Sequence, residues 1–199
     1  MATHVTDSEL VQTMLGGDKE AFAELYRRRQ RDVFRFALHM TGAPDVAEDV
    51  TQEVFMVLMR KGSEYDELRG SVCAFLLGVA RNQVLRHLRR ERPFLPLDAA
   101  VSNVAATNEP GASETLTQKE AIMAMHKAVL NLPAHYREVV VLCDLQELSY
   151  AEAAAALGSA IGTVRSRLHR ARIILIERLR TSTNEGAPKK ELESTRCFA

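Results

Sequence analysis

Tryptophan is absent from this chain of 199 residues, and cysteine is nearly so, with three residues. Cys73, Cys143 and Cys197 lie far apart without CxxC spacing, which indicates neither a disulfide framework nor a zinc site. Cys73 and Cys143 stand in apolar segments, so we expect reduced core residues. Cys197 stands in a polar segment, where a lone cysteine usually has no role; a redox role for it stays an open alternative.

Long apolar runs are also missing. No stretch approaches the ~20 residues that a helix needs to cross a bilayer. Residues 1–9 are polar and acidic where a signal peptide would have a basic start and an apolar stretch. We therefore expect a cytoplasmic protein without membrane insertion. The hydrophobic and charged fractions, 46% and 26%, are those of a globular protein with room for one large or two small domains.

Net charge is lacking as well, because 26 basic side chains balance 26 acidic ones. This balance hides two basic clusters. The range 161–180 holds six arginines and one glutamate, and the range 81–92 holds five arginines and one glutamate. Two such clusters on a neutral chain predict two places where phosphate is bound. The alternative is that each cluster is a solvated helix face.

Apolar residues recur with a helical period nearly throughout, and no segment alternates like a strand, so we predict an all-α fold. Thr6 and Glu9 form a capping box for a first helix that Gly16 ends, and Asp18 and Asp45 can cap the next two helices. The next helices are expected at about 18–40, 45–61, 71–92 and 118–132. Pro133 is expected to be the first residue of the helix after these, and the last two helices cover about 150–157 and 161–180.

The composition changes between the helices expected at 71–92 and 118–132. The segment 94–117 is rich in Ser, Thr, Ala and Asn, contains Pro and Gly, and carries only acidic charges. This composition is typical of a flexible linker. We therefore expect two small helical domains, 1–95 and 118–181, joined by a flexible linker at 96–117 and followed by a disordered tail at 182–199.

The second domain shows the pattern of a helix-turn-helix: a short capped helix, a glycine turn and a longer arginine-rich helix. Ser149 and Glu152 form the capping box, and Gly158 ends the short helix. The buried stripe of the longer helix is predicted to be Val164, Leu168, Ala171, Leu175 and Leu179. The N-terminal part of a recognition helix enters the major groove, where an arginine fork pairs with guanine. The outward positions that can reach base edges are Arg165, Ser166, His169 and Arg170.

These residues resemble a known pattern. LSYAEAA (148–154) and GTVRSRLHRAR (162–172) are similar to region 4 of the extracytoplasmic-function sigma factors, and LPAHYREV (132–139) is similar to the LPxxxRxV approach to that region. The resemblance implies that this domain reads the minus-thirty-five promoter element. The contacts it implies are Arg165, Ser166, His169 and Arg170. Ala160 departs from the family, which often has a capping Ser or a Pro there, and Ser159 is expected to take that role.

The expected helix 45–61 carries a second motif. Asp49, Gln52 and Glu53 lie on its polar face, which by itself is either a solvated surface or a landing site for a basic partner helix. AEDVTQEVF (47–55) is similar to the DxxQEVF signature of sigma region 2.2. In that family this surface binds a coiled coil on the clamp of RNA polymerase. The resemblance places the polymerase contacts on Asp49, Gln52, Glu53 and Met59.

The expected helix 71–92 carries a third motif. YDELRGSVCAFLLGVARN (65–82) is similar to the family's FDxxRGSxxAWLxxIARN stretch, whose loop captures a flipped base of the minus-ten element. Such a base needs stacking and hydrogen bonds, and arginines can hold the phosphates beside it. Phe75 stands where the family has Trp, and Tyr65 where Phe is common, so the preferred base stays open. The residues implied are Tyr65, Leu68, Asn82, Arg86, Arg89 and Arg90.

The resemblance covers about 7–181, with both sets of motifs in the family's order. It implies an alternative sigma factor that binds core RNA polymerase and promoter DNA, opens the minus-ten DNA, and is held inactive by an anti-sigma factor. We expect no enzyme, metal or cofactor, since the six histidines and the carboxylates form no triad, metal spacing or phosphate loop.

Two other functions stay open. A one-component regulator would use the helix-turn-helix alone and would bind DNA tightly without polymerase, but it gives the 47–55 motif no purpose. A sigma mimic that only sequesters an anti-sigma factor would lack the basic recognition residues that both domains have here. The promoter sequence, the inducing signal, the inhibitor and the role of the tail are not encoded in these motifs.

Overall fold

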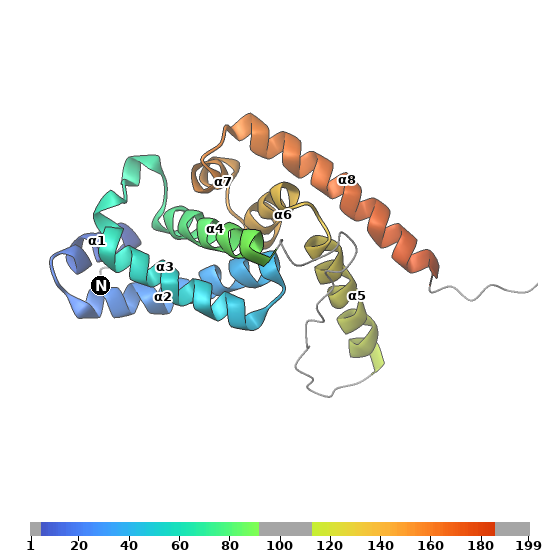
Figure 1. The fold of residues 1–199 in the computed structure, drawn as a ribbon, viewed down its shortest axis with the longest axis horizontal. Coiled ribbons are helices and arrows are strands. Elements are labelled where there is room, and N and C mark those ends of the chain that lie inside the picture. Colours follow the sequence, from blue (N-terminus) through green and yellow to red (C-terminus); the bar gives the residue numbers. More distant parts are fainter. Residues whose placement is uncertain (1–4, 92–112, 186–199) are drawn as a thin grey trace, which may run out of the picture.

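The computed structural model describes residues 5–91 and 113–185 and places the side chains of 5–90 and 121–180. Within these parts every regular element is helical, as predicted. Figure 1 shows the first three helices at one end, α4 (Val72–Glu91) in the middle, and α8 (Ile161–Glu185) as a long helix that extends beyond the rest. None of the described helices combines the length and hydropathy that a bilayer crossing requires.

The N-terminal half consists of α1 (Asp7–Leu15), α2 (Lys19–Thr41), α3 (Pro44–Lys61) and α4, with the 3-10 turns η1 (Gly62–Glu64) and η2 (Glu67–Arg69) before α4. Side-chain caps fix the N-terminal ends of α1 and α2. The Thr6 hydroxyl accepts from the Glu9 amide at 3.2 Å, and the Thr6 amide donates to the Glu9 carboxylate at 2.7 Å. The Asp18 carboxylate accepts from the Glu20 amide at 2.8 Å. Both predicted caps are confirmed.

The start of α3 differs from the prediction, which was wrong about Asp45 as its cap. Ala43 is the N-cap, without a side-chain hydrogen bond, and Pro44 is the first helical residue. Proline suits that position because its φ is already helical and its missing N–H would have no helical partner. Gly42 makes the turn from α2 with a φ of +74°, a conformation that favours glycine. Asp45 instead lies in the first turn, near the positive end of the helix dipole.

The C-terminal half consists of α5 (Ser113–Leu130), α6 (Ala134–Val140), the π-helical turn η4 (Val141–Leu145), α7 (Tyr150–Leu157) and α8. Three bounds differ from the sequence prediction. α5 begins inside the segment predicted as linker, α8 continues into the segment predicted as tail, and Pro133 is the N-cap of α6 rather than its first residue. The rest of the predicted linker and tail, with Cys197, lies outside the described residues.

The two halves pack against each other around one continuous hydrophobic core. α4 lies against α7, and α2 lies against α5, α6 and η4. Gly78 permits the first of these contacts, because a Cβ there would lie 3.1 Å from the carbonyl oxygen of Ala156 on α7. The alanines of α7 therefore lie in two environments. Ala153 and Ala154 are buried in the core, while Ala156 contacts α4. The largest fully buried side chains come from both halves and include Leu25, Phe36, Met40, Leu58, Leu132, Leu142 and Leu168.

Candidate nucleic-acid and polymerase interfaces

The helix-turn-helix is built by a capping box and a left-handed glycine. The Ser149 hydroxyl accepts from the Glu152 amide at 3.2 Å, and the Ser149 amide donates to the Glu152 carboxylate at 3.1 Å. Gly158 ends α7 with a φ of +60°, after which α8 begins at Ile161. The Ser159 hydroxyl is buried without a hydrogen-bond partner, so it does not cap α8 and that expectation was wrong. The predicted order of short helix, turn and long helix is confirmed.

The recognition helix α8 buries one side and exposes the other. Val164, Leu168, Ala171 and Leu175 are buried, while Leu179 is half-buried. The four residues predicted to contact the minus-thirty-five element are all exposed: Arg165, Ser166, His169 and Arg170. These positions have the steps of one, three and one that place side chains on one helix face. The structure thus leaves a basic face of α8 open to solvent.

A tyrosine on α7 extends this face. The guanidinium carbon of Arg165 lies 5.7 Å from the centre of the Tyr150 ring, within the range of a cation–π contact. Tyr150 is itself 38% exposed. Sequence reasoning used Tyr150 only as part of a family motif and missed this contact, because the two residues stand on different helices.

The other arginines of α8 include two with acidic partners in the same half. Arg167 lies 3.5 Å from the Glu138 carboxylate, and Arg172 lies 2.6 Å from the Asp144 carboxylate. The cluster at 161–180 is therefore not one uniform phosphate-binding surface. Glu138 was missed as an important residue, since its 2% exposure and its partners become visible only in the fold.

The predicted polymerase-binding face lies on α3. Asp49, Gln52 and Met59 are exposed, and Met59 has 55% of its surface free. Glu53 is partly exposed and its carboxylate accepts from Arg60 at 2.8 Å. Met56, 45% exposed, adds a second apolar side chain to the acidic and amide groups. Such a face offers hydrogen-bond acceptors beside flexible apolar contacts, which suits a basic amphipathic helix.

In the loop predicted to capture a minus-ten base, Tyr65 and Leu68 have opposite environments. Tyr65 is only 9% exposed, its hydroxyl lies 2.9 Å from that of Ser8, and its ring meets Phe75 edge-on at 5.7 Å. Leu68, in contrast, is 97% exposed. Tyr65 therefore supports the loop from inside, and Leu68 projects from it. The Phe75 ring lines the groove and has no polar atom with which to hydrogen-bond a base.

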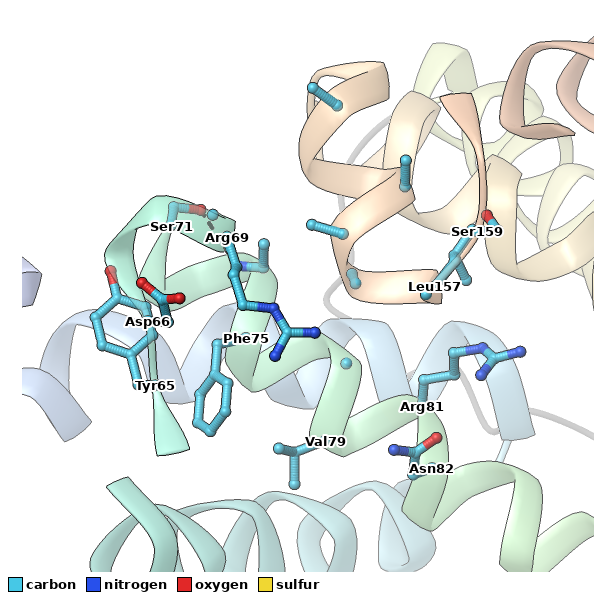
Figure 2. A pocket seen from close by; sticks show the side chains of 18 of the residues that line it. Tyr65, Asp66, Arg69, Ser71, Phe75, Val79, Arg81, Asn82, Leu157 and Ser159 are labelled. Atoms are coloured by element: carbon cyan, nitrogen blue, oxygen red, sulfur yellow. Dashed lines mark hydrogen bonds between the residues drawn. The ribbon is translucent and has the colours of Figure 1, made fainter. Parts of the chain in front are cut away.

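A groove of about 1030 Å³ lies between this loop, α4 and the end of α7. Figure 2 shows Phe75, Val79 and Asn82 along α4 on one side and Leu157 and Ser159 on the other. Among the predicted minus-ten residues, the groove is lined by Tyr65 and Asn82, but not by Leu68 or by the arginines at 86, 89 and 90. Arg86, Arg89 and Arg90 are exposed farther along α4. Asn82, Arg86, Arg89 and Arg90 thus share α4, while Tyr65 and Leu68 lie in the preceding loop, and only Asn82 and Tyr65 line the groove.

The described cysteines are poor nucleophiles. Burial raises the pKa of the Cys73 thiol to about 11, and burial likewise raises the pKa of Cys143 to about 11. Both thiols are therefore protonated at neutral pH. Both also pack against the hydrophobic core, as expected of reduced core residues. Within the described residues, His, Cys, Asp and Glu form no cluster that could hold a metal ion.

A helix-turn-helix with an open basic face is typical of DNA-binding proteins. The family described as Sigma-70 region 2 matches residues 25–94, and the family described as Sigma-70, region 4 matches residues 122–175. The chain is 33% identical over 169 residues to the ECF RNA polymerase sigma factor SigM of Mycobacterium tuberculosis, covering 84% of this chain and 81% of SigM. This chain belongs to the family of extracytoplasmic-function (ECF) RNA polymerase sigma factors.

Two further relatives agree with this assignment. SigE of Mycolicibacterium smegmatis, also an ECF RNA polymerase sigma factor, is 32% identical over 176 residues, or 86% of this chain and 67% of SigE. The sigma factor RpoE of Bartonella quintana, solved in complex with the anti-sigma factor NepR, has 28% identity and a TM-score of 0.65 over 80% of this chain and 96% of RpoE. The helical fold is therefore shared with solved sigma factors.

Proposed function

We propose that this chain is an alternative sigma factor that docks on core RNA polymerase, reads two promoter elements and opens the DNA at the second. The observation that carries the proposal is the joint exposure of Arg165, Ser166, His169 and Arg170 on the N-terminal part of α8. Those side chains are free to enter a major groove, while the opposite side of the helix holds it on the core. The proposed reaction is protein–DNA recognition, and the covalent chemistry belongs to the polymerase.

The halves divide this work. The domain 1–95 would bind the polymerase clamp through the exposed face of α3 and would trap a minus-ten base beside Asn82. The domain 118–181 would bind the minus-thirty-five duplex. The segment 96–117 would connect them, and 182–199 would follow as a tail. Because polymerase and promoter lie in the cytoplasm, the protein would work there.

An anti-sigma factor is the proposed negative regulator. RpoE of Bartonella quintana shares this fold and was solved with the anti-sigma factor NepR. A partner of that type would act by covering the polymerase-binding or DNA-binding faces. The exposed methionines on α3, Met56 and Met59, provide an adaptable apolar surface for either partner.

Run-off transcription tests the proposal. Purified core polymerase is given a library of promoter fragments, with and without the chain, and a defined subset of new transcripts is expected. Arg170→Ala should reduce them by about 5- to 150-fold, because one good base contact is worth about 1–3 kcal/mol. Arg180→Ala, on the exposed far part of the same helix, is the matched control.

The polymerase face is tested in the same assay. Gln52→Ala combined with Glu53→Ala should abolish transcription while leaving duplex DNA binding unchanged. Gln12→Ala combined with Glu20→Ala makes the same exchanges at exposed positions of α1 and α2 and should have no effect. Specific DNA retention without any transcript would favour a one-component regulator. The absence of both transcripts and DNA binding would favour a mimic that sequesters an anti-sigma factor.

A further inference from the structure

A contact between the two helices of the helix-turn-helix joins an aromatic ring to one of the proposed base-reading arginines. Tyr150 is the first residue of α7, and the guanidinium carbon of Arg165 on α8 lies over its ring, 5.7 Å from the ring centre. Both side chains are exposed to solvent. A cation–π contact at an exposed site adds little to stability. Its main consequence here is for the orientation of the arginine.

The ring is held in place by the structure around it. The Ser149 hydroxyl donates to the Glu152 carboxylate at 2.7 Å, within the capping box that fixes the first turn of α7 directly at Tyr150. α7 also packs on α8. A tyrosine side chain has few rotatable bonds, so holding it still costs little conformational entropy. The ring therefore has a fixed place beside α8 before any DNA is bound.

Arg165 and Arg170 differ in what supports them. Arg172, seven residues beyond Arg165 on α8, is engaged by the Asp144 carboxylate at 2.6 Å. In the described part of the chain, neither Arg165 nor Arg170 has an acidic partner within ion-pair distance, so both cations are available to DNA. Arg165 lies over a ring, whereas Arg170 has no ring contact among the described residues. The same helix face thus carries one supported arginine and one unsupported arginine.

Support by a ring leaves the hydrogen-bonding edge of an arginine free. A guanidinium meets a ring through its flat face, while its N–H donors point outward in its own plane. The Arg165 fork can therefore still donate to O6 and N7 of a guanine in the major groove. An unsupported arginine loses the freedom of a long flexible side chain when a base fixes its fork. The Tyr150 ring removes part of that loss in advance.

We propose that Tyr150 is a positioning residue for the minus-thirty-five element: its ring orients the Arg165 guanidinium for a guanine, while Arg170 on the same face reads its base without such support. This inference rests on the proposed function, which supplies the DNA element. Loss of the ring is therefore expected to weaken one base preference and to leave the other unchanged. The phenol hydroxyl has no part in this role.

Competition binding by the holoenzyme, formed from core polymerase and the full chain, tests the proposal. A promoter found by run-off transcription is the reference, and fragments in which one minus-thirty-five base is replaced are the competitors. Arg165→Ala and Arg170→Ala first show which base each arginine reads, because each variant no longer discriminates at its own position. Unfolding in urea verifies that every variant retains a folded core.

The ring is then removed or kept. Tyr150→Leu should weaken binding of the reference promoter about two- to fivefold, the range expected for an exposed cation–π contact, and the lost discrimination should be confined to the base that Arg165 reads. Tyr150→Gln is a second ring-free variant with the same expected result, so the test does not depend on the folding of one variant. Tyr150→Phe keeps the ring without the hydroxyl and should match the unmodified chain.

Double variants separate positioning from a general effect on the helix-turn-helix. In the Arg165→Ala chain, Tyr150→Leu should cause no further loss, and in the Arg170→Ala chain it should cause its full two- to fivefold loss. The inference is overturned if Tyr150→Phe is as weak as Tyr150→Leu, because the hydroxyl would then be the active group. It is also overturned if the loss is equal at every minus-thirty-five position or persists without Arg165.

Failure of the proposed function would give a different result. If the unmodified holoenzyme produces no transcript, the proposed function fails, and the same variants are compared on duplexes that the chain alone retains from the fragment library. The absence of any specific DNA binding would reject both proposals. Normal transcription in which Arg165→Ala keeps every base preference would reject the positioning role of Tyr150 and leave the proposed function intact.

Discussion

Among the described residues other than glycine, Glu147 is the one with a positive φ. Its φ of +58° lies in the left-handed region, and its side chain is exposed just after the π-helical turn. The residue lies in the connection between η4 and α7. A side chain with a Cβ is strained there by about 1 kcal/mol or more.

Glu147→Gly is therefore expected to raise the free energy of unfolding by about 0.5–1 kcal/mol, because the strain is relieved at the cost of a more flexible unfolded chain. Urea unfolding followed by circular dichroism measures the change. Glu147→Ala removes the same carboxylate but keeps the Cβ, and should not stabilise. If both substitutions shift the midpoint equally, backbone strain is not the cause.

At single positions, the sequence predicted which side chains are exposed better than it predicted which side chains contact one another. The outward face of α8 could be read from helical steps alone, and Arg165, His169 and Arg170 are indeed exposed. Glu138 could not be found in this way, because its partners Arg81 and Arg167 lie 57 and 29 positions away along the chain. Tyr65 does line the groove, but the sequence did not predict that it is largely buried and that its hydroxyl meets Ser8 of a separate helix.

The helices themselves are determined mainly by their ends. α7 is short, with eight residues, so one cap contributes a large share of its stability. The hydrogen bonds from Ser149 hold the pKa of Glu152 below its ordinary value, which keeps this capping carboxylate charged. The position of α7 in turn sets the angle at which α8 presents its basic face.

Ser149→Ala is expected to lower the free energy of unfolding by about 1 kcal/mol, the usual loss for removing a hydroxyl cap. Chemical denaturation measures it, and amide hydrogen exchange should show faster exchange confined to the first turn of α7. Ser149→Thr retains the hydroxyl and should stay close to the unmodified chain. An alanine variant as stable as the threonine variant would show that the capping box contributes nothing here.

Three of the five proposed side-chain caps were predicted correctly, and the exceptions are Asp45 and Ser159. Thr6, Asp18 and Ser149 all cap as expected. The start of α5 was missed because the polar residues that follow Ser113 have no apolar period and look like linker. The π-helical turn was also missed, since the apolar run 139–143 is compatible with any helical register.

For the whole molecule, the sequence predicted two helical halves but not how they pack against each other. The contact of α4 with α7 depends on the absence of side chains at Gly78, which no periodic pattern records. Another contact between the halves, that of α2 with α5, places two histidines edge-to-face: the His39 and His126 ring centres lie 4.9 Å apart. This pair makes the packing of the halves sensitive to acid.

Burial, followed by the charges of His126 and Arg35, lowers the pKa of His39 to about 4. In the unfolded chain a histidine titrates near 6.5. Between these values the unfolded chain binds one more proton at this residue, so the free energy of unfolding rises with pH. The contribution of neutral His39 is complete above about pH 6.5 and is lost as the pH falls toward 4. The carboxylates of Glu9, Glu24 and Glu152 have lowered pKa values and add acid sensitivity at lower pH.

His39→Phe keeps a ring against His126 but cannot take up a proton. We expect its free energy of unfolding, measured in urea at several pH values, to change less between pH 6.5 and 5 than that of the unmodified chain. His169→Asn, at an exposed position of α8, should retain the original slope. Parallel pH profiles for all three proteins would mean that His39 is protonated as readily in the folded chain as in the unfolded one. A flatter profile for the phenylalanine variant alone would assign the acid sensitivity in this range to the contact between α2 and α5.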